Sequence, residues 1–138
     1  MALINIWAVL VAALAYMIIG MVWYSPLLFG NTWLKLMNKT PKEVKQMRKG
    51  AGKAFAFSIL IALVLSYVLA QSFLLLQDIV LTFRDGIVVA FWLWLGFIAT
   101  TQLNSVLYEQ KPFKMYLINV GCLLVSVVVM ALIQVMWM

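Results

Sequence analysis

Few side chains in this sequence could bind a polar ligand, and one group of them recurs at helical spacing. Four polar residues have relative offsets of 0, 3, 4 and 7: Thr101, Asn104, Ser105 and Tyr108. This spacing predicts one face of an α-helix. Hydroxyl and amide groups donate and accept hydrogen bonds without carrying a charge. One hypothesis is an inner-leaflet cluster that binds a lipid headgroup or another polar ligand, formed by Trp23, Tyr24, Ser25, Thr101, Asn104, Ser105, Tyr108, Glu109 and Asn119.

The same residues also have an interpretation that needs no ligand. Polar side chains of adjacent membrane helices hydrogen-bond across their interface, at about 0.6 kcal/mol per contact on average. Trp23 and Tyr24 are typical of the membrane–water interface, where amphipathic rings anchor a helix end. The residue types favour this structural interpretation, and ligand binding is the alternative.

The sequence offers little for catalysis. It has no histidine and a single cysteine, Cys122, so it lacks the commonest general base and any pair of thiols. We therefore predict no catalytic residue, no metal site and no cofactor. A lipid-acting enzyme that uses Tyr108 and Glu109 is the weakest of three functional hypotheses.

The elements that must position these groups are membrane helices. The chain is 67% hydrophobic and only 10% charged, whereas a soluble domain has about 25% charged residues. Four uncharged runs have the roughly 20 residues that a helix needs to cross the hydrocarbon core. They predict an all-α membrane protein, with one domain over residues 1–138 and a four-helix bundle whose spans are about 3–24, 54–76, 86–108 and 115–137.

Basic residues predict the orientation of this bundle. The first connection, residues 25–53, contains one acidic residue, Glu43, and seven basic ones: Lys35, Lys39, Lys42, Lys45, Arg48, Lys49 and Lys53. Short basic connections stay in the cytoplasm. We therefore expect residues 25–53 and 109–114 on the cytoplasmic side of the inner membrane, and both termini outside. Anionic lipid headgroups are the expected partners of the basic connection, and nucleic acid is not.

The basic connection contains its own helix signals. Pro26 disfavours helical geometry at Ser25, so the first membrane helix should break there. A short interfacial helix capped by Ser25 should follow, with lipid-facing side chains at Leu27, Leu28, Trp33, Leu34 and Met37. Thr40 and Glu43 have capping-box spacing, which predicts the start of a second, amphipathic helix.

A row of small residues runs along the second predicted span. Five of them recur at intervals of four: Ala54, Ser58, Ala62, Ser66 and Ala70. Such faces let membrane helices approach closely. The leading hypothesis is a non-enzymatic membrane protein that packs through this face, as a homo-oligomer or an accessory subunit, although the partner helix could belong to the same chain. The alternative is a small carrier or channel whose pathway includes Thr101, Asn104 and Asn119.

Two motifs resemble those of a known family. The first is Gly20-x-x-Trp23-Tyr24-Ser25-Pro26-x-Leu28-Phe29-Gly30-x-x-Trp33. The second is Leu103-Asn104-Ser105-Val106-Leu107-Tyr108-Glu109-x-Lys111-Pro112-Phe113-Lys114-x-Tyr116-x-Ile118-Asn119-x-Gly121. Together they resemble the bacterial integral-membrane family catalogued as domain of unknown function 1761, over essentially the whole chain. The resemblance implies a four-helix inner-membrane protein and implies no activity.

Overall fold

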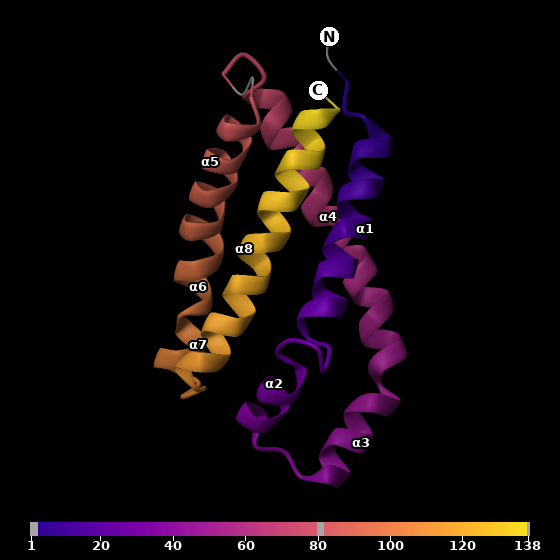
Figure 1. The fold of residues 1–138 in the computed structure, drawn as a ribbon, viewed down its shortest axis with the longest axis vertical. Helices are drawn as coiled ribbons and strands as arrows, with labels where there is room; N and C mark the ends of the chain where they lie inside the picture. Colours follow the sequence, from indigo (N-terminus) through magenta and orange to yellow (C-terminus); the bar gives the residue numbers. More distant parts are fainter. Residues whose placement is uncertain (1–2, 80–81, 138) are drawn as a thin grey trace.

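The computed structural model describes residues 3–79 and 82–137, and every regular element within them is helical. Four helical segments are long and apolar enough to cross a membrane: Ile6–Trp23, Ala51–Leu75, Phe83–Leu107 and Phe113–Met136. They run alongside one another, and the first and last described residues lie at the same end of the bundle (Figure 1). The predicted four-helix membrane fold is confirmed, including the short helices between the first two spans.

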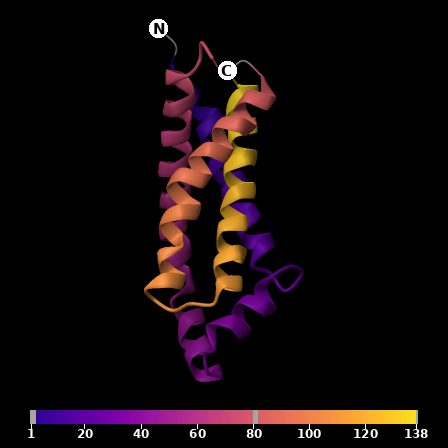
Figure 2. The same ribbon diagram turned by 90° about the vertical axis from the view of Figure 1, so that its left-hand side faces the viewer.

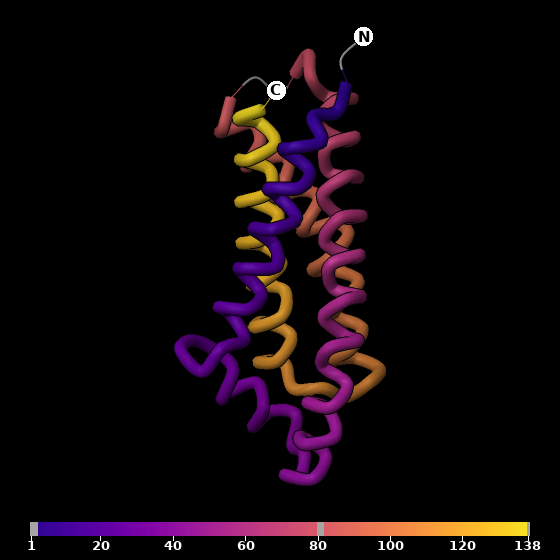
Figure 3. The backbone as a smooth tube through the Cα atoms, turned by 90° about the vertical axis from the view of Figure 1, so that its right-hand side faces the viewer, coloured from indigo at the N-terminus to yellow at the C-terminus, as the bar shows by residue number. Residues whose placement is uncertain are grey.

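The four spans pack in a curved row. Helix α8 (Phe113–Met136) packs against α1 (Ile6–Trp23) and against α5 (Phe83–Leu93), as Figures 1 and 2 show. Helix α1 lies in turn between α8 and α4 (Ala51–Leu75) (Figure 3). Among the described residues, α4 and α5 hardly contact each other. The bundle is therefore open on the side between α4 and α5.

The main hydrophobic core lies in the half of the bundle nearer the chain ends. Its buried side chains come from all four spans: Ala12, Leu69, Phe73, Ala90, Val127, Met130 and Ala131. Small residues among them let the helix backbones approach closely at this end. The spans are therefore held together most firmly away from α2 and α3.

The row of small residues on α4 divides between two environments. Three of its members are buried inside the bundle: Ala62, Ser66 and Ala70. The buried Ser66 hydroxyl donates a hydrogen bond to the Val9 carbonyl of α1 at 2.8 Å. At the other end Ala54 is exposed, and the Ser58 hydroxyl donates to the Ala54 carbonyl of its own helix. Much of the row therefore packs α4 against its own chain.

The chain makes a tight turn between α1 and α2 (Gly30–Met37). The Ser25 carbonyl accepts hydrogen bonds from the N–H groups of Leu28 and Gly30, at 3.1 and 3.0 Å. The predicted break near Ser25 is therefore present. The expectation that Ser25 caps the next helix is wrong, because residues 26–29 are used in the turn and α2 begins only at Gly30.

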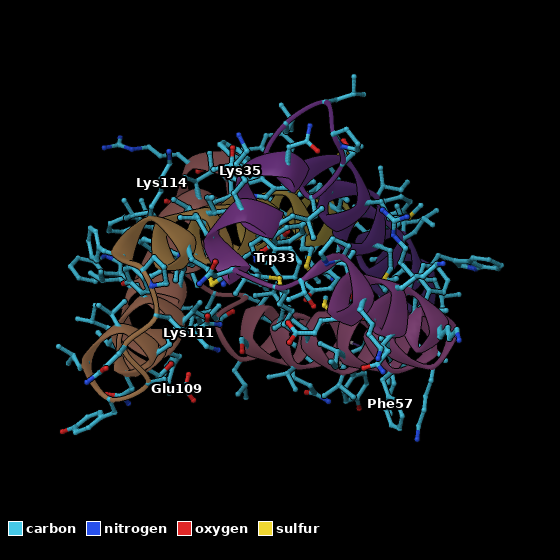
Figure 4. All side chains as sticks on the ribbon, turned by 90° about the horizontal axis from the view of Figure 1, so that it is seen from below. Trp33, Lys35, Phe57, Glu109, Lys111 and Lys114 are labelled. Atoms are coloured by element: carbon cyan, nitrogen blue, oxygen red, sulfur yellow. The ribbon has the colours of Figure 1, made fainter. Side chains whose placement is uncertain are left out.

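Helix α2 lies against the bundle, and the Trp33 side chain packs toward the bundle. The Trp33 ring meets the Tyr24 ring edge-on, with centroids 5.7 Å apart, and its indole nitrogen is buried. Seen from the end that carries α2 and α3, Trp33 lies near the middle of the bundle (Figure 4). The expectation that Trp33 faces lipid is wrong, because α2 folds back onto α8. Leu27 and Leu28 are exposed, as expected for residues that meet lipid.

The capping box predicted at Thr40 is present. The Glu43 N–H donates to Thr40 Oγ1 at 3.3 Å, and the Thr40 N–H donates to Glu43 Oε2 at 3.2 Å. Helix α3 (Pro41–Lys49) follows, and only Gly50 separates it from α4. The turn between α2 and α3 places Asn38 in the left-handed region at φ 51°, which asparagine tolerates better than most residues.

The third span changes helix type midway. Helix α5 continues into a π-helical segment, η1 (Trp94–Ala99), and then into α6 (Thr100–Gln102) and α7 (Asn104–Leu107). A π turn contains an extra residue, so it rotates the residues that follow by about 100° relative to a continuous α-helix. Side-chain hydroxyl groups donate hydrogen bonds to backbone carbonyls along this stretch. Lipid tails could not supply such donors. The bonds run from Thr100 to Gly96 at 2.7 Å, from Thr101 to Phe97 at 2.6 Å, and from Tyr116 to Ala99 at 2.6 Å.

Candidate functional site

Two aromatic residues join the end of α1 to the side of α8. The Tyr24 hydroxyl lies 2.7 Å from Asn119 Oδ1 and donates a hydrogen bond to it. The Trp23 indole N–H donates to the Ile118 carbonyl at 3.0 Å. The Trp23 ring lies close over Gly121, where an added Cβ would be 3.3 Å from the indole. Both rings therefore hold α1 and α8 in register at the end near α2.

The turn that carries Tyr24 depends on a glycine. A Cβ added at Gly30 would lie 2.5 Å from the Tyr24 carbonyl oxygen and 2.7 Å from the Ser25 carbonyl carbon. These are backbone atoms, so no side-chain rotation could relieve the overlap. Gly30 thus permits the compact turn that directs Tyr24 toward Asn119.

A partly open polar pocket of about 240 Å³ lies beside this hydrogen bond. No charged side chain lines it. Its lining comes from α1 with its C-cap residue, from α6 and from α8: Tyr16, Gly20, Tyr24, Gln102, Asn119, Cys122, Leu123 and Ser126. Within the described part of the chain, the Tyr16 hydroxyl and the Gln102 amide form no hydrogen bond. The pocket can therefore offer donors and acceptors to an uncharged polar group.

Asn119 also lines a second pocket, of about 520 Å³, between α2 and the start of α8. The walls of this pocket include two lysines, Lys39 and Lys111, and the partly buried Trp33. The Trp33 indole nitrogen has no hydrogen-bond partner among the residues that the structure describes. Asn119 is therefore shared between a partly open, uncharged pocket and a basic pocket at the end of the bundle.

An apolar groove of about 360 Å³ occupies the open side between α4 and the third span. Its lining is almost entirely apolar: Leu65, Val68, Leu69, Ser72, Leu93, Trp94, Phe97, Ile98 and Val127. The groove and the uncharged pocket use the same two helical segments. Ile98 precedes Gln102 by one turn, and Val127 follows Leu123 by one turn. The polar pocket is thus followed along the bundle by an apolar surface.

The structure brings part of the predicted cluster together. Tyr24 and Asn119 are directly hydrogen-bonded, and Trp23 bonds the residue that precedes Asn119. Ser25 is adjacent in sequence, but its hydroxyl donates to the Val22 carbonyl at 2.6 Å, within the end of α1. The chemical role predicted for these residues stays a prediction.

The other predicted residues do not join them. The Thr101 hydroxyl bonds its own helix, and the Ser105 hydroxyl likewise donates to the Gln102 carbonyl at 2.8 Å. Asn104 is exposed, and Tyr108 is 82% exposed. The expectation that this face turns into the bundle is wrong, since Ser and Thr hydroxyls can satisfy themselves on the preceding turn and the π segment rotates the helix.

Glu109, the remaining predicted residue, lies at the edge of the bundle. Its carboxylate forms an ion pair with Lys111 at 3.2 Å, and both side chains are more than half exposed. Figure 4 shows the two residues close together, away from Trp33. Exposed ion pairs of this kind contribute little to stability, about 0–1 kcal/mol.

Several pocket residues were not predicted, although two helices carried a signal for them. Asn119, Cys122 and Ser126 have offsets of 0, 3 and 7 along α8, and all line the uncharged pocket. Tyr16 and Gly20 precede Tyr24 by two turns and one turn on α1. These are helix-face spacings that the sequence displays. Gln102 follows the π segment and lines the pocket from an exposed position that no periodicity in the sequence predicts.

Comparisons with known proteins add a family and no activity. No curated protein and no solved structure matches the chain. The family described as "Protein of unknown function (DUF1761)" matches residues 7–135. The matched range includes all four spans except the ends of the first and last, together with both pockets at Asn119. The chain therefore belongs to the DUF1761 family of proteins of unknown function.

Proposed function

We propose that this protein is a non-enzymatic membrane protein that binds an amphiphilic molecule in the manner of a small carrier. The polar part of the ligand occupies the uncharged pocket beside Asn119, and its apolar chain lies in the groove between α4 and η1. The observation that carries the proposal is the succession of a polar pocket and an apolar groove along the same two helical segments. A molecule with one polar and one apolar end matches both surfaces.

The hydrogen-bonding groups of the pocket are suited to a polar ligand. The Tyr24 hydroxyl is paired with Asn119, whereas the half-buried Tyr16 hydroxyl and the exposed Gln102 amide line the pocket and bond no other described residue. Both groups can donate a hydrogen bond to a ligand and accept one from it.

The proposed orientation places the polar pocket toward the cytoplasmic leaflet of the inner membrane. Helices α2 and α3 contain five of the seven basic residues of the first connection, and the second pocket at Asn119 adjoins α2. Basic connections favour the cytoplasmic side. An amphiphile of that leaflet could enter sideways, through the open side between α4 and α5.

The competing hypotheses have less support. Self-association through α4 would use a row whose members Ala62 and Ser66 are already buried within the chain. A channel through Thr101 would run along exposed side chains that bond their own helix. An enzyme based on Glu109 would rely on an exposed, ion-paired carboxylate.

Cysteine labelling tests whether the polar pocket admits solutes. In a Cys122→Ser background, we expect Gln102→Cys to react with a small water-soluble methanethiosulfonate, and a monoacylglycerol to slow that reaction about tenfold at saturation. Thr101→Cys, at the neighbouring exposed position that lines neither the pocket nor the groove, is the matched control. Its labelling rate should not depend on the monoacylglycerol. Equal protection at both positions, or no protection at position 102, would contradict the proposed site.

A further inference from the structure

The turn between α2 and α3 forms a separate basic pocket of about 460 Å³. Four of the residues that line it are cationic: Lys35, Lys39, Lys45 and Arg48. Its other lining residues are apolar: Leu34, Pro41 and Val44. No acidic side chain lines it. The pocket therefore combines a concentrated positive charge with an apolar wall.

The local structure leaves these four cations without an acidic partner among the described residues. Within the described residues, none of them forms an ion pair with a carboxylate. Glu43, the acidic residue of this connection, is used in the capping box with Thr40. Lys39 is directed across the turn, where its Nζ lies 3.3 Å from Met47 Sδ of α3. The positive charges are therefore available to an external anion.

We propose that this pocket binds the phosphate group of an anionic membrane lipid. A phosphodiester accepts charge-assisted hydrogen bonds from ammonium groups, and the planar guanidinium of Arg48 can donate two parallel bonds to it. The apolar wall distinguishes a lipid from a soluble phosphate compound, because Leu34 and Val44 can contact the glycerol and upper acyl region.

The site is distinct from the proposed amphiphile site. The basic pocket and the uncharged pocket share no lining residue. Occupation of one does not require occupation of the other, so each proposal can fail alone. The two sites also differ in ligand class, since the uncharged pocket has no cation to pair with a phosphate.

Matched charge variants test the phosphate site. The first variant, Lys35→Gln/Lys45→Gln/Arg48→Gln, removes three cations that line the pocket. The second, Lys42→Gln/Lys49→Gln/Lys53→Gln, removes three cations of the same connection that do not line it. All six side chains are exposed, so both variants should fold, and circular dichroism can verify their helix content. The readout is the affinity of the purified protein for dioctanoyl phosphatidylglycerol.

We expect the first variant to lose affinity for phosphatidylglycerol by about tenfold or more, and the second by no more than about threefold. Wild-type protein should bind phosphatidylglycerol more tightly than phosphatidylcholine, and glycerol 3-phosphate only weakly. Equal losses in the two variants would overturn the proposal in favour of diffuse attraction. Tight binding of glycerol 3-phosphate would overturn it in favour of a soluble ligand. Asn119→Leu should leave phosphatidylglycerol affinity unchanged, which separates this test from that of the amphiphile site.

Discussion

Replacing Gly30 with alanine is expected to destabilise the protein by about 1–3 kcal/mol, a typical cost of overpacking a tight site. The added Cβ would lie 2.5 Å from the Tyr24 carbonyl oxygen and 2.8 Å from the Ser25 carbonyl oxygen. Relief requires the turn between α1 and α2 to open. Because Tyr24 leads into this turn, its hydrogen bond to Asn119 should be lost with it.

Thermal unfolding in detergent or nanodiscs measures this effect. Gly52→Ala is the matched control, since an added Cβ at that exposed position of α4 meets no atom within 4 Å. It should leave the midpoint unchanged or raise it slightly, because alanine favours a helix over glycine by about 1 kcal/mol. A midpoint for Gly30→Ala equal to that of Gly52→Ala would show that the turn does not need its glycine.

Replacing Asn119 with leucine is expected to weaken amphiphile binding by about tenfold or more. The substitution keeps a side chain of similar length but removes the amide that both pockets share. It also leaves the Tyr24 hydroxyl without its acceptor on α8. The stability of the bundle should fall less, because an interhelical hydrogen bond in a membrane contributes about 0.6 kcal/mol on average.

Equilibrium binding of a fluorescent monoacylglycerol to protein in nanodiscs measures this prediction. Asn31→Leu makes the same change at an exposed position of α2 that lines neither pocket. The account predicts wild-type affinity for Asn31→Leu and a large loss for Asn119→Leu. Tyr24→Phe should fall between them, since it removes one hydroxyl and keeps the ring. Equal affinities for the two asparagine variants would mean that Asn119 only joins the helices.

Local sequence signals predicted the fold well. Long uncharged runs dictate membrane helices because an unpaired backbone cannot remain in lipid. Thr40 and Glu43 predicted the start of α3 because a capping box acts within one turn of chain. The break near Ser25 was predictable from Pro26 for the same reason. Each of these features depends on residues within a few positions of one another.

The candidate site depended on contacts that no local pattern encodes. Trp23 and Tyr24 have the residue types of an interfacial anchor, yet they bond α8 residues that are 95 positions away in the chain. A π segment interrupts the third span before the predicted polar face, Gln102 lines the pocket, and the threonine hydroxyls bond their own helix. Gly30 is needed only because the turn packs onto the backbone of Tyr24 and Ser25. These features follow from packing between distant segments.

The central claim is that the pocket beside Asn119 holds one amphiphile. Native mass spectrometry of the protein released from its membrane tests this claim most directly. Gly20→Phe places a large ring in this pocket, where an added Cβ meets no atom within 4 Å. Gly52→Phe places the same ring on the exposed face of α4. The account predicts one retained amphiphile per chain in the wild type and Gly52→Phe, and none in Gly20→Phe. A wild-type protein without a retained amphiphile, or equal retention in all three, would contradict it.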